Sequence, residues 1–434
     1  MIRGSHPRRR TVLVAAAVLM LSATVACGAG SGGSQGSPDE AELVMTIWGS
    51  ENDTRTYQQR ADAYTAAHPG VTVAVRNIPI DNYDQQVETM ITGGSSPDIV
   101  LVSGTRAPGL AARGGILPLD NLLKESNLVI EDHVDPARID AYRFGGATYA
   151  LPDRGGSVFL YYNKTMFRKA GVPEPRPGWT WDEFTAAARA LTIVEGGQTV
   201  QYGAAVDDWP QAVQSVARSF GATMFTDSLD AAAIDSPEYR EALTAYVALA
   251  QSGVSPTLED YADFGQNVNR DALFAQQRTA MIWAGPWDIP DFVEQGIDFG
   301  IAPPPVAKQG EPTMMALGTG LAVGAHSSNQ AAAWKVIEYM FSAEGQRPIV
   351  ENAQDVPTSL ELVPEWVASL PGDVSYDAIA AVPDAVFAVR APEQIAEVLE
   401  QVEQDLYPMF VGTTTVDEAT ATAAANINAI LSDR

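Results

Sequence analysis

Tryptophans, carboxylates, an asparagine and an arginine lie at or after the ends of several apolar segments that predict β-strands. They are Trp48, Glu51, Asn52 and Asp53 after the first segment, Arg106 after a later one, and Asp207, Asp208 and Trp209 after a third. Aromatic faces pack on apolar C–H patches, and planar polar groups pair with hydroxyls. The pattern therefore suits the binding of a molecule that carries both kinds of surface.

Composition excludes other chemistries. The chain has one cysteine, Cys27, and four scattered histidines, so neither a disulfide within the chain nor a His- or Cys-built metal site is expected, and no cofactor is implied. The formal net charge of −27 argues against binding of nucleic acid. With 434 residues and 46% hydrophobic content, the chain is expected to fold into two lobes rather than around one core.

The N-terminus carries an export signal. Arginines precede the apolar run 11–26, which is too short to span a membrane, and residues 1–26 are therefore predicted to be a signal peptide. The sequence Thr24-Val25-Ala26-Cys27 resembles the lipobox of bacterial lipoproteins, which implies lipidation of Cys27 and a flexible Gly/Ser tether over 27–40. The alternative is an ordinary secretion signal in which the cysteine is incidental.

Apolar runs alternate with amphipathic stretches, which predicts an α/β architecture with doubly wound, parallel-crossover sheets. The expected strands are 43–48, 71–76, 98–102, 157–163, 202–206, 279–283 and 318–323. The expected helices are 52–68, 83–92, 180–191, 209–220, 236–253, 330–340, 343–352, 394–406 and 416–431. Two of these helices begin with capping boxes, Thr180-Trp181-Asp182-Glu183 and Thr415-Val416-Asp417-Glu418.

Several strings, in order along the chain, resemble the family 1 extracellular solute-binding proteins, the maltose-binding-like receptors of ABC sugar importers. They are the GGSSPDIV run at 93–100, YNK at 162–164, TWDEF at 180–184, TAMI with GPW at 279–287, the helix at 331–346, and TVDEA at 415–419. The resemblance implies a periplasmic-binding-protein-like α/β fold with two lobes, hinge strands and a cleft. The expected lobes are 41–152 plus 284–342 and 153–283 plus 343–434, with hinges near 151–153, 283–285 and 342–345.

The resemblance also assigns roles to the residues that follow the strands. Trp287 matches the family's stacking tryptophan, although it could instead pack beneath the hinge. Arg106 matches an arginine that reaches sugar hydroxyls, but Thr105 stands where the family has an acid beside it. Ligands of open α/β sheets bind beyond the carboxyl ends of the strands, which favours Asp207, Asp208 and Trp209 as cleft residues.

Each of these residues also has a purely structural interpretation. Trp48 could belong to the core, and Glu51, Asn52 and Asp53 could simply cap the helix that follows. Asp207 and Asp208 could cap the next helix, because acids are favourable at a helix N-terminus. Asp153 and its neighbour Arg154 could serve either the ligand or the hinge. Other tryptophans are expected in the core, namely Trp179, Trp181 and Trp334.

The function that the resemblance implies is an extracytoplasmic, lipid-anchored, monomeric carbohydrate receptor. It would capture a sugar, expected to be an oligosaccharide, by lobe closure and deliver it to an ABC permease without any catalytic step. Two alternatives stay open at this point. One is a receptor for peptides or polyamines, and the other is a secreted glycoside hydrolase, which would need a pair of carboxylates across the scissile bond.

Overall fold

The computed structural model describes residues 37–134, 136–206, 208–264, 268–307, 314–315, 317–370, 386–387 and 391–432. The predicted signal peptide and Cys27 lie outside these residues. Within the described part of the chain, no helix is both long and apolar enough to cross a bilayer. Residues Gln35–Arg434 form one compact unit, which contains two separate larger sheets.

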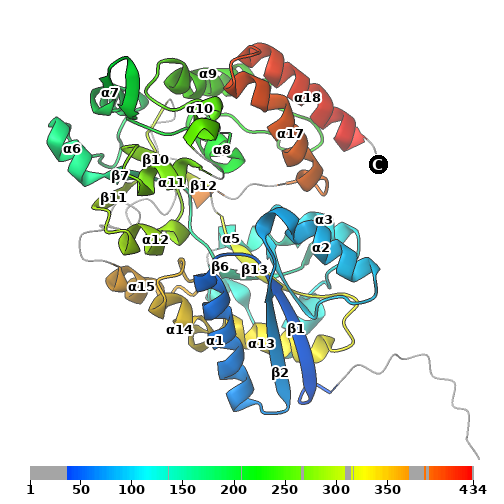
Figure 1. The fold of residues 1–434 in the computed structure, drawn as a ribbon. Helices are drawn as coiled ribbons and strands as arrows, with labels where there is room; N and C mark the ends of the chain where they lie inside the picture. The colour runs from blue at the N-terminus through cyan, green and yellow to red at the C-terminus, as the bar shows by residue number, and fades with distance from the viewer. Residues whose placement is uncertain are drawn as a thin grey trace, which may run out of the picture. The chain divides into compact units, whose positions relative to one another are not determined.

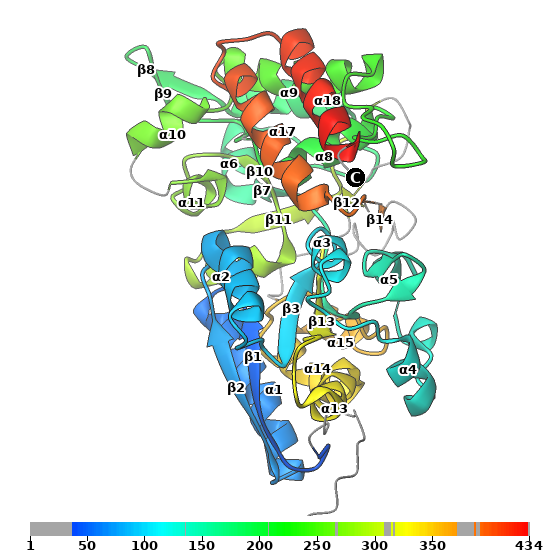
Figure 2. The ribbon, with the colours of Figure 1, turned by 90° about the vertical axis from the view of Figure 1, so that its right-hand side faces the viewer.

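The first sheet has the strand order β2-β1-β3-β13-β6 (Figures 1 and 2). Its members are β1 (Ala41–Ile47), β2 (Val71–Asn77), β3 (Ile99–Ser103), β6 (Leu151–Arg154) and β13 (Thr319–Val323). β1 pairs in parallel with both β2 and β3, as expected from the alternation of strands and helices. β13 runs antiparallel to β3 and to β6, so this side of the sheet departs from the parallel pattern.

Helices α1 (Glu51–Ala67), α13 (Gln330–Phe341) and α14 (Ala343–Glu351) pack against one another beside the first sheet. α1 begins at a capping box in which Ser50 and Asp53 satisfy each other's backbone N–H groups, and its buried face includes Tyr57. Two more helices of this part are α2 (Ile80–Thr92) and α3 (Ala107–Ala112).

The second sheet has the order β10-β7-β11 and is antiparallel. Its strands are β7 (Phe159–Asn163), β10 (Met281–Ala284) and β11 (Phe299–Ala302). The predicted strand 202–206 forms only isolated bridges, from Tyr202 to Thr279 and from Ala205 to Ile282. The surrounding helices are α6 (Lys164–Ala170), α7 (Trp181–Leu191), α8 (Pro210–Ser219), α9 (Pro237–Gln251), α17 (Ile395–Phe410) and α18 (Val416–Ser432). Both predicted capping boxes are present, at Thr180 and Thr415.

Shorter elements connect these parts. They are α4 (Asp120–Ser126), η1 (Ile130–Asp132), α5 (Pro136–Asp140), β4 (Arg143–Phe144), β5 (Ala147–Thr148), β8 (Ile193–Glu195), β9 (Gln198–Gln201), α10 (Leu258–Phe264), α11 (Arg270–Ala275), η2 (Pro286–Asp288), α12 (Ile289–Glu294), β12 (Met314–Met315), α15 (Val363–Ser369) and β14 (Val386–Phe387).

Strand pairing corrects the expected path of the chain between the sheets. β11 pairs with β7, so the chain stays with the second sheet after β10 and returns to the first only between β11 and β13. The segment 284–342, expected to belong to one lobe, is therefore divided between the two sheets. α14 contacts α1 and α13, whereas the expected boundary assigns the residues after 342 to the other lobe. The chain passes from the first sheet to the second between the end of β6 at Arg154 and the start of β7 at Phe159, whereas the expected hinge is at 151–153.

Two buried apolar clusters follow the same division, whereas another combines residues of α14 and α15 with residues of the second sheet. One buried cluster combines β7, β10 and the helices around them, with Trp283 fully buried among its members. Another fills the first sheet's faces, and Trp334 belongs to it. Trp179 is buried, and Trp181 is partly buried against the cluster around Trp283, so these tryptophans lie where the sequence predicts them.

Candidate functional site

Two tryptophans meet at the end of β10. Trp287 lies in η2, directly after the turn Gly285-Pro286, and Trp209 precedes the first turn of α8. Their ring centroids are 6.4 Å apart and the rings are nearly perpendicular, at 85°. Both side chains are only partly buried. The structure therefore brings together two predicted site residues and leaves part of their aromatic surface accessible.

Arg270 packs against Trp209, and sequence reasoning missed it. Its guanidinium carbon lies 4.0 Å from the centroid of the Trp209 ring, within range of a cation–π interaction. Its Nε donates to the carbonyl oxygen of Trp283 at 2.8 Å, and the residue is only 9% exposed. Arg270 thus fixes Trp209 to the end of β10. The only local signal was its position at the start of a short helix capped by Asn269.

Acidic residues lie close to both tryptophans in the chain. Burial, together with the neighbouring Asp271, raises the pKa of Asp288 well above its ordinary value, although Arg270 opposes the shift. Burial and the charges of Glu294 and Asp53 also raise the pKa of Asp291. Asp208 is partly buried next to Trp209, whereas Asp207 lies outside the described residues. This region disfavours added negative charge.

A different cluster of side chains lies at the carboxyl ends of β1 and β3 in the first sheet. Trp48, at the end of β1, is 9% exposed and packs edge-on against Tyr83, with centroids 4.8 Å apart. The guanidinium carbon of Arg106 lies 4.9 Å from the centroid of the Trp48 ring. The Nε of Arg106 donates to Asp84 at 2.7 Å. Sequence reasoning found Trp48 and Arg106 but missed Asp84, because nothing in the local pattern of α2 marks it.

The residues at the start of α1 have mainly structural partners. Asp53 caps the helix, accepts from Gln354 and pairs with Arg154 at 2.9 Å. Burial favours a higher pKa for Asp53, but Arg154 and the hydrogen bonds outweigh it and hold the pKa below its usual value. Asn52 donates to the carbonyl oxygen of Asn352 at 3.2 Å, and Glu51 is exposed.

Asp153 is enclosed by partners from α1. It is 1% exposed, pairs with Arg60 at 2.5 Å and accepts from the hydroxyl of Tyr57 at 2.6 Å. Arg60 also donates to the carbonyl oxygens of Gly345 and Met340, both at 2.7 Å. These contacts join β6, α1 and the α13–α14 junction, which favours the hinge interpretation of Asp153 over ligand contact.

Arg154 continues the same network toward the crossing segment. It approaches Asp355 at 3.5 Å, and burial raises the pKa of Asp355 to about 6 because Arg154 compensates only in part. At Gly156, two residues further on, a Cβ atom would overlap the ring of Pro286. The crossing segment after β6 therefore packs directly on the turn that carries Trp287.

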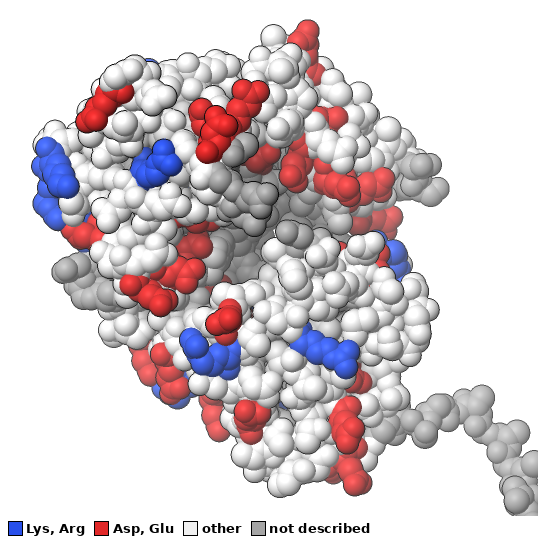
Figure 3. Space-filling model, in the orientation of Figure 1, with Lys and Arg blue, Asp and Glu red and all other residues white. Residues whose placement is uncertain are grey.

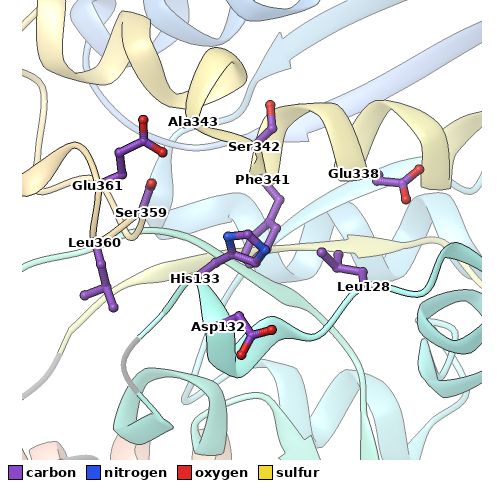
Figure 4. A pocket seen from close by; sticks show the side chains of 10 residues that line it. All are labelled: Leu128, Asp132, His133, Glu338, Phe341, Ser342, Ala343, Ser359, Leu360 and Glu361. Atoms are coloured by element: carbon purple, nitrogen blue, oxygen red, sulfur yellow. The ribbon is translucent and has the colours of Figure 1, made fainter.

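A separate pocket of about 360 Å³ lies at the end of α13 (Figure 4). Its lining includes His133, which packs edge-on against Phe341, and it contains none of the predicted site residues.

Among the described residues, no group of three or more His, Cys, Asp or Glu side chains could hold a metal ion. Acidic side chains are spread widely over the face drawn in Figure 3, which is hollowed near its middle.

The sequence and the fold identify a class of proteins. The profile of the bacterial extracellular solute-binding protein family matches residues 48–347, so the chain belongs to this family. An ABC substrate-binding protein of Listeria monocytogenes, solved in complex with cycloalternan, superposes with a TM-score of 0.83 at 21% identity, covering 90% of this chain and 98% of that one. This likeness confirms the two-lobed α/β fold.

Two curated relatives are similar in sequence. The maltotriose-binding protein of Pyrococcus abyssi is 26% identical over 306 residues, which cover 68% of this chain and 62% of that protein. The galactooligosaccharide-binding protein of Bacillus subtilis is 24% identical over 355 residues, which cover 78% and 79%. The family resemblance drawn from the short sequence strings is thereby confirmed.

Proposed function

We propose that this protein is an extracytoplasmic receptor that captures a carbohydrate, an oligosaccharide in particular, and delivers it to an ABC permease. The observation that carries the proposal is the partly exposed pair Trp209–Trp287, held by Arg270 at the end of β10. Flat apolar faces suit the C–H side of a pyranose ring. The names of the relatives, which bind maltotriose and galactooligosaccharide, support the same ligand class.

Capture works by closure of the lobes. A ligand that touches both lobes binds the closed state more tightly and shifts the open–closed equilibrium by that difference. The segments after β6 and before β13 are the proposed hinges, and the network of Arg60, Asp153 and Arg154 is the proposed anchor of the first. Trp287, Trp209 and Asp208 contact the ligand from the second lobe, and Arg106 over Trp48 contacts it from the first.

The receptor acts as a monomer attached to the outer face of the membrane through a lipid on Cys27. Two or more acyl chains suffice for stable attachment, since each buried methylene contributes about 0.8 kcal/mol. A Cys27→Ser variant is expected to leave the membrane fraction or to stay unprocessed. Membrane retention of a fully processed variant would instead show that attachment needs no lipid there.

A thermal-shift screen tests the ligand class. A ligand that binds only the folded protein raises its stability by RT ln(1 + [L]/Kd), so a matching sugar raises Tm, and a sugar that binds more tightly raises it further at the same concentration. The panel comprises maltotriose, galactotriose, cycloalternan, monosaccharides and matched peptides and polyamines. Small-angle scattering with the best ligand should then show a smaller radius of gyration. If every sugar leaves Tm unchanged, the proposal of a carbohydrate receptor is wrong.

A cationic solute is the second candidate, favoured by the acidic side chains Asp288 and Asp291, which follow Trp287 in η2 and α12. Salt distinguishes the two, because screening weakens attraction between charges but does not act on stacked rings. Affinity for a neutral sugar should change little with salt, whereas affinity for a polyamine should fall steeply. The bound sugar should also be recovered intact, since capture involves no hydrolysis, and accumulation of shorter products would favour a glycoside hydrolase.

A further inference from the structure

Helix α2 is tied to the end of the first sheet by one buried side chain. The hydroxyl oxygen of Tyr83 lies 2.8 Å from the carbonyl oxygen of Leu101 on β3 and 3.1 Å from that of Thr46 on β1. Tyr83 is almost fully buried, so this anchor is shielded from water. It fixes the next residue, Asp84, at the carboxyl ends of the two strands.

Asp84 binds one edge of the Arg106 guanidinium. The Nε of Arg106 donates to Oδ2 of Asp84 at 2.7 Å, while its guanidinium lies over the ring of Trp48. The side chain of Arg106 is 22% exposed and that of Asp84 is 47% exposed, so both reach solvent. Between the indole and the carboxylate, the guanidinium plane has a defined orientation.

The remaining polar atoms of this pair are available to a ligand. Among the described residues, neither terminal nitrogen of Arg106 has a hydrogen-bond acceptor, and Oδ1 of Asp84 has no donor. Thr105 does not take the place of the missing neighbouring acid, because its hydroxyl lies 2.9 Å from that of Ser103. Asp84, from a different element, is the acid that accompanies Arg106 in this chain.

We propose that Asp84 is a specificity-determining residue of the ligand site in the first lobe, an inference that rests on the proposed carbohydrate function. Its carboxylate and the free N–H groups of Arg106 form adjacent acceptor and donor positions, which match two neighbouring hydroxyls of a neutral sugar. The same carboxylate offsets the charge of Arg106 and excludes anionic solutes, which would otherwise find an exposed guanidinium.

The helix offers a matched control. Glu88, one turn after Asp84 on α2, is 45% exposed and pairs with Arg113, so it is a surface ion pair of the same kind away from Trp48. Asp84→Asn and Glu88→Gln therefore remove one charge each from similar surroundings. Any general effect of weakening a surface ion pair on α2 should appear in both variants.

The test is titration calorimetry of the wild type, Asp84→Asn, Glu88→Gln and Trp287→Ala. The neutral probes are maltotriose, galactotriose and cycloalternan, and the anionic probe is sn-glycerol 3-phosphate. Asp84→Asn should weaken binding of the best neutral probe about tenfold and strengthen binding of sn-glycerol 3-phosphate by a similar factor. Glu88→Gln should bind every probe with the affinity of the wild type. If Asp84 had a purely structural role, its substitution would not reverse the preference for neutral over anionic probes.

The outcomes separate the two proposals. If Trp287→Ala weakens sugar binding while Asp84→Asn binds both kinds of probe as the wild type does, the role of Asp84 is overturned and the carbohydrate receptor stands. An equal loss in Glu88→Gln, or an Asp84→Asn variant that weakens both probes alike, would also overturn that role. If the wild type binds none of the neutral probes, the receptor function itself fails, and this inference fails with it.

Discussion

The two arginine–tryptophan clusters use the same pair of side chains in opposite ways. At the end of the first sheet, Trp48 is buried and Arg106 lies over it with an edge toward solvent. At the end of the second sheet, Arg270 is buried and supports Trp209, which packs against Trp287, and both tryptophans are partly exposed. The first cluster therefore presents hydrogen-bond donors, and the second presents aromatic faces.

This difference indicates how one ligand could satisfy both sheet ends. A sugar ring has hydroxyls around its edge and C–H groups on its faces, so a polar edge on one side and a flat apolar surface on the other complement it. In each cluster the buried partner fixes the exposed one, which lowers the entropy lost on binding. The comparison predicts that equivalent substitutions in the two clusters have different consequences.

The largest effect is expected on stability, from Trp48→Ala. The indole packs in the core against Tyr83 and supports Arg106, so its removal leaves a cavity and should lower the free energy of unfolding by about 3–5 kcal/mol. Chemical denaturation monitored by circular dichroism measures this change. Trp48→Phe is the control and should recover much of the loss. A loss below about 1 kcal/mol in Trp48→Ala would contradict the assignment of Trp48 as the buried support.

Trp287→Ala should weaken ligand binding strongly and change stability little, the opposite of what is expected for Trp48→Ala. Truncation of an aromatic anchor costs about 2 kcal/mol or more in binding, which is a loss of about thirtyfold in affinity for the best sugar of the panel. Stability should change much less than in Trp48→Ala, because part of the Trp287 side chain already contacts solvent. Calorimetric titration and denaturation of the same variant measure both quantities. Unchanged affinity would assign Trp287 to packing beneath the crossing segment.

The sequence predicts local structure well, both in the two clusters and elsewhere in the chain. Helix starts depend on nearby residues, and the capping boxes at Thr180 and Thr415 therefore appear where expected. Trp48 and Arg106 follow β1 and β3, and the position of a residue after a strand is enough to place it at the sheet's end.

The partners that complete the clusters depend on contacts between distant segments. Arg270 reaches Trp209 from another helix, Asp84 reaches Arg106 from α2, and Arg60 lies 93 positions before Asp153. None of these pairings leaves a periodic signal along the chain. β11 was missed for a related reason: its four residues, FGIA, become a strand only through pairing with β7.

A smaller, pH-dependent effect is expected in the network beside the crossing segment. Burial raises the pKa of Asp355 to about 6 and the charge of Asp53 adds to the shift, although Arg154 and Arg138 oppose it. A raised pKa means that the carboxylate costs stability once the pH exceeds about 6 and costs little below about 4. Asp355→Asn should therefore raise the free energy of unfolding by about 1–2 kcal/mol at pH 8 and change it little at pH 4.

Asp53 pairs with the same guanidinium, that of Arg154, but its pKa shifts in the opposite direction. Its pKa is lowered, so its contribution to stability is present at neutral pH and is lost as the pH falls through its folded-state pKa. Asp53→Asn should thus destabilise the protein at pH 8, whereas Asp355→Asn stabilises it. Denaturation curves at both pH values compare the variants directly, and equal shifts of the same sign would show that Arg154 does not discriminate between the two carboxylates.

The smallest effect on stability is expected for Asp84→Asn, the variant that should change the preference for neutral over anionic ligands most. The Arg106–Asp84 pair is partly exposed, and such pairs typically contribute about 0–1 kcal/mol. Asp84→Asn should therefore lower the free energy of unfolding by no more than about 1 kcal/mol, as should Glu88→Gln. Helix α2 is held by the buried hydroxyl of Tyr83, which neither substitution touches. A much larger loss in Asp84→Asn alone would mean that the carboxylate supports the fold, and the first cluster would then resemble the second in burying its essential charge.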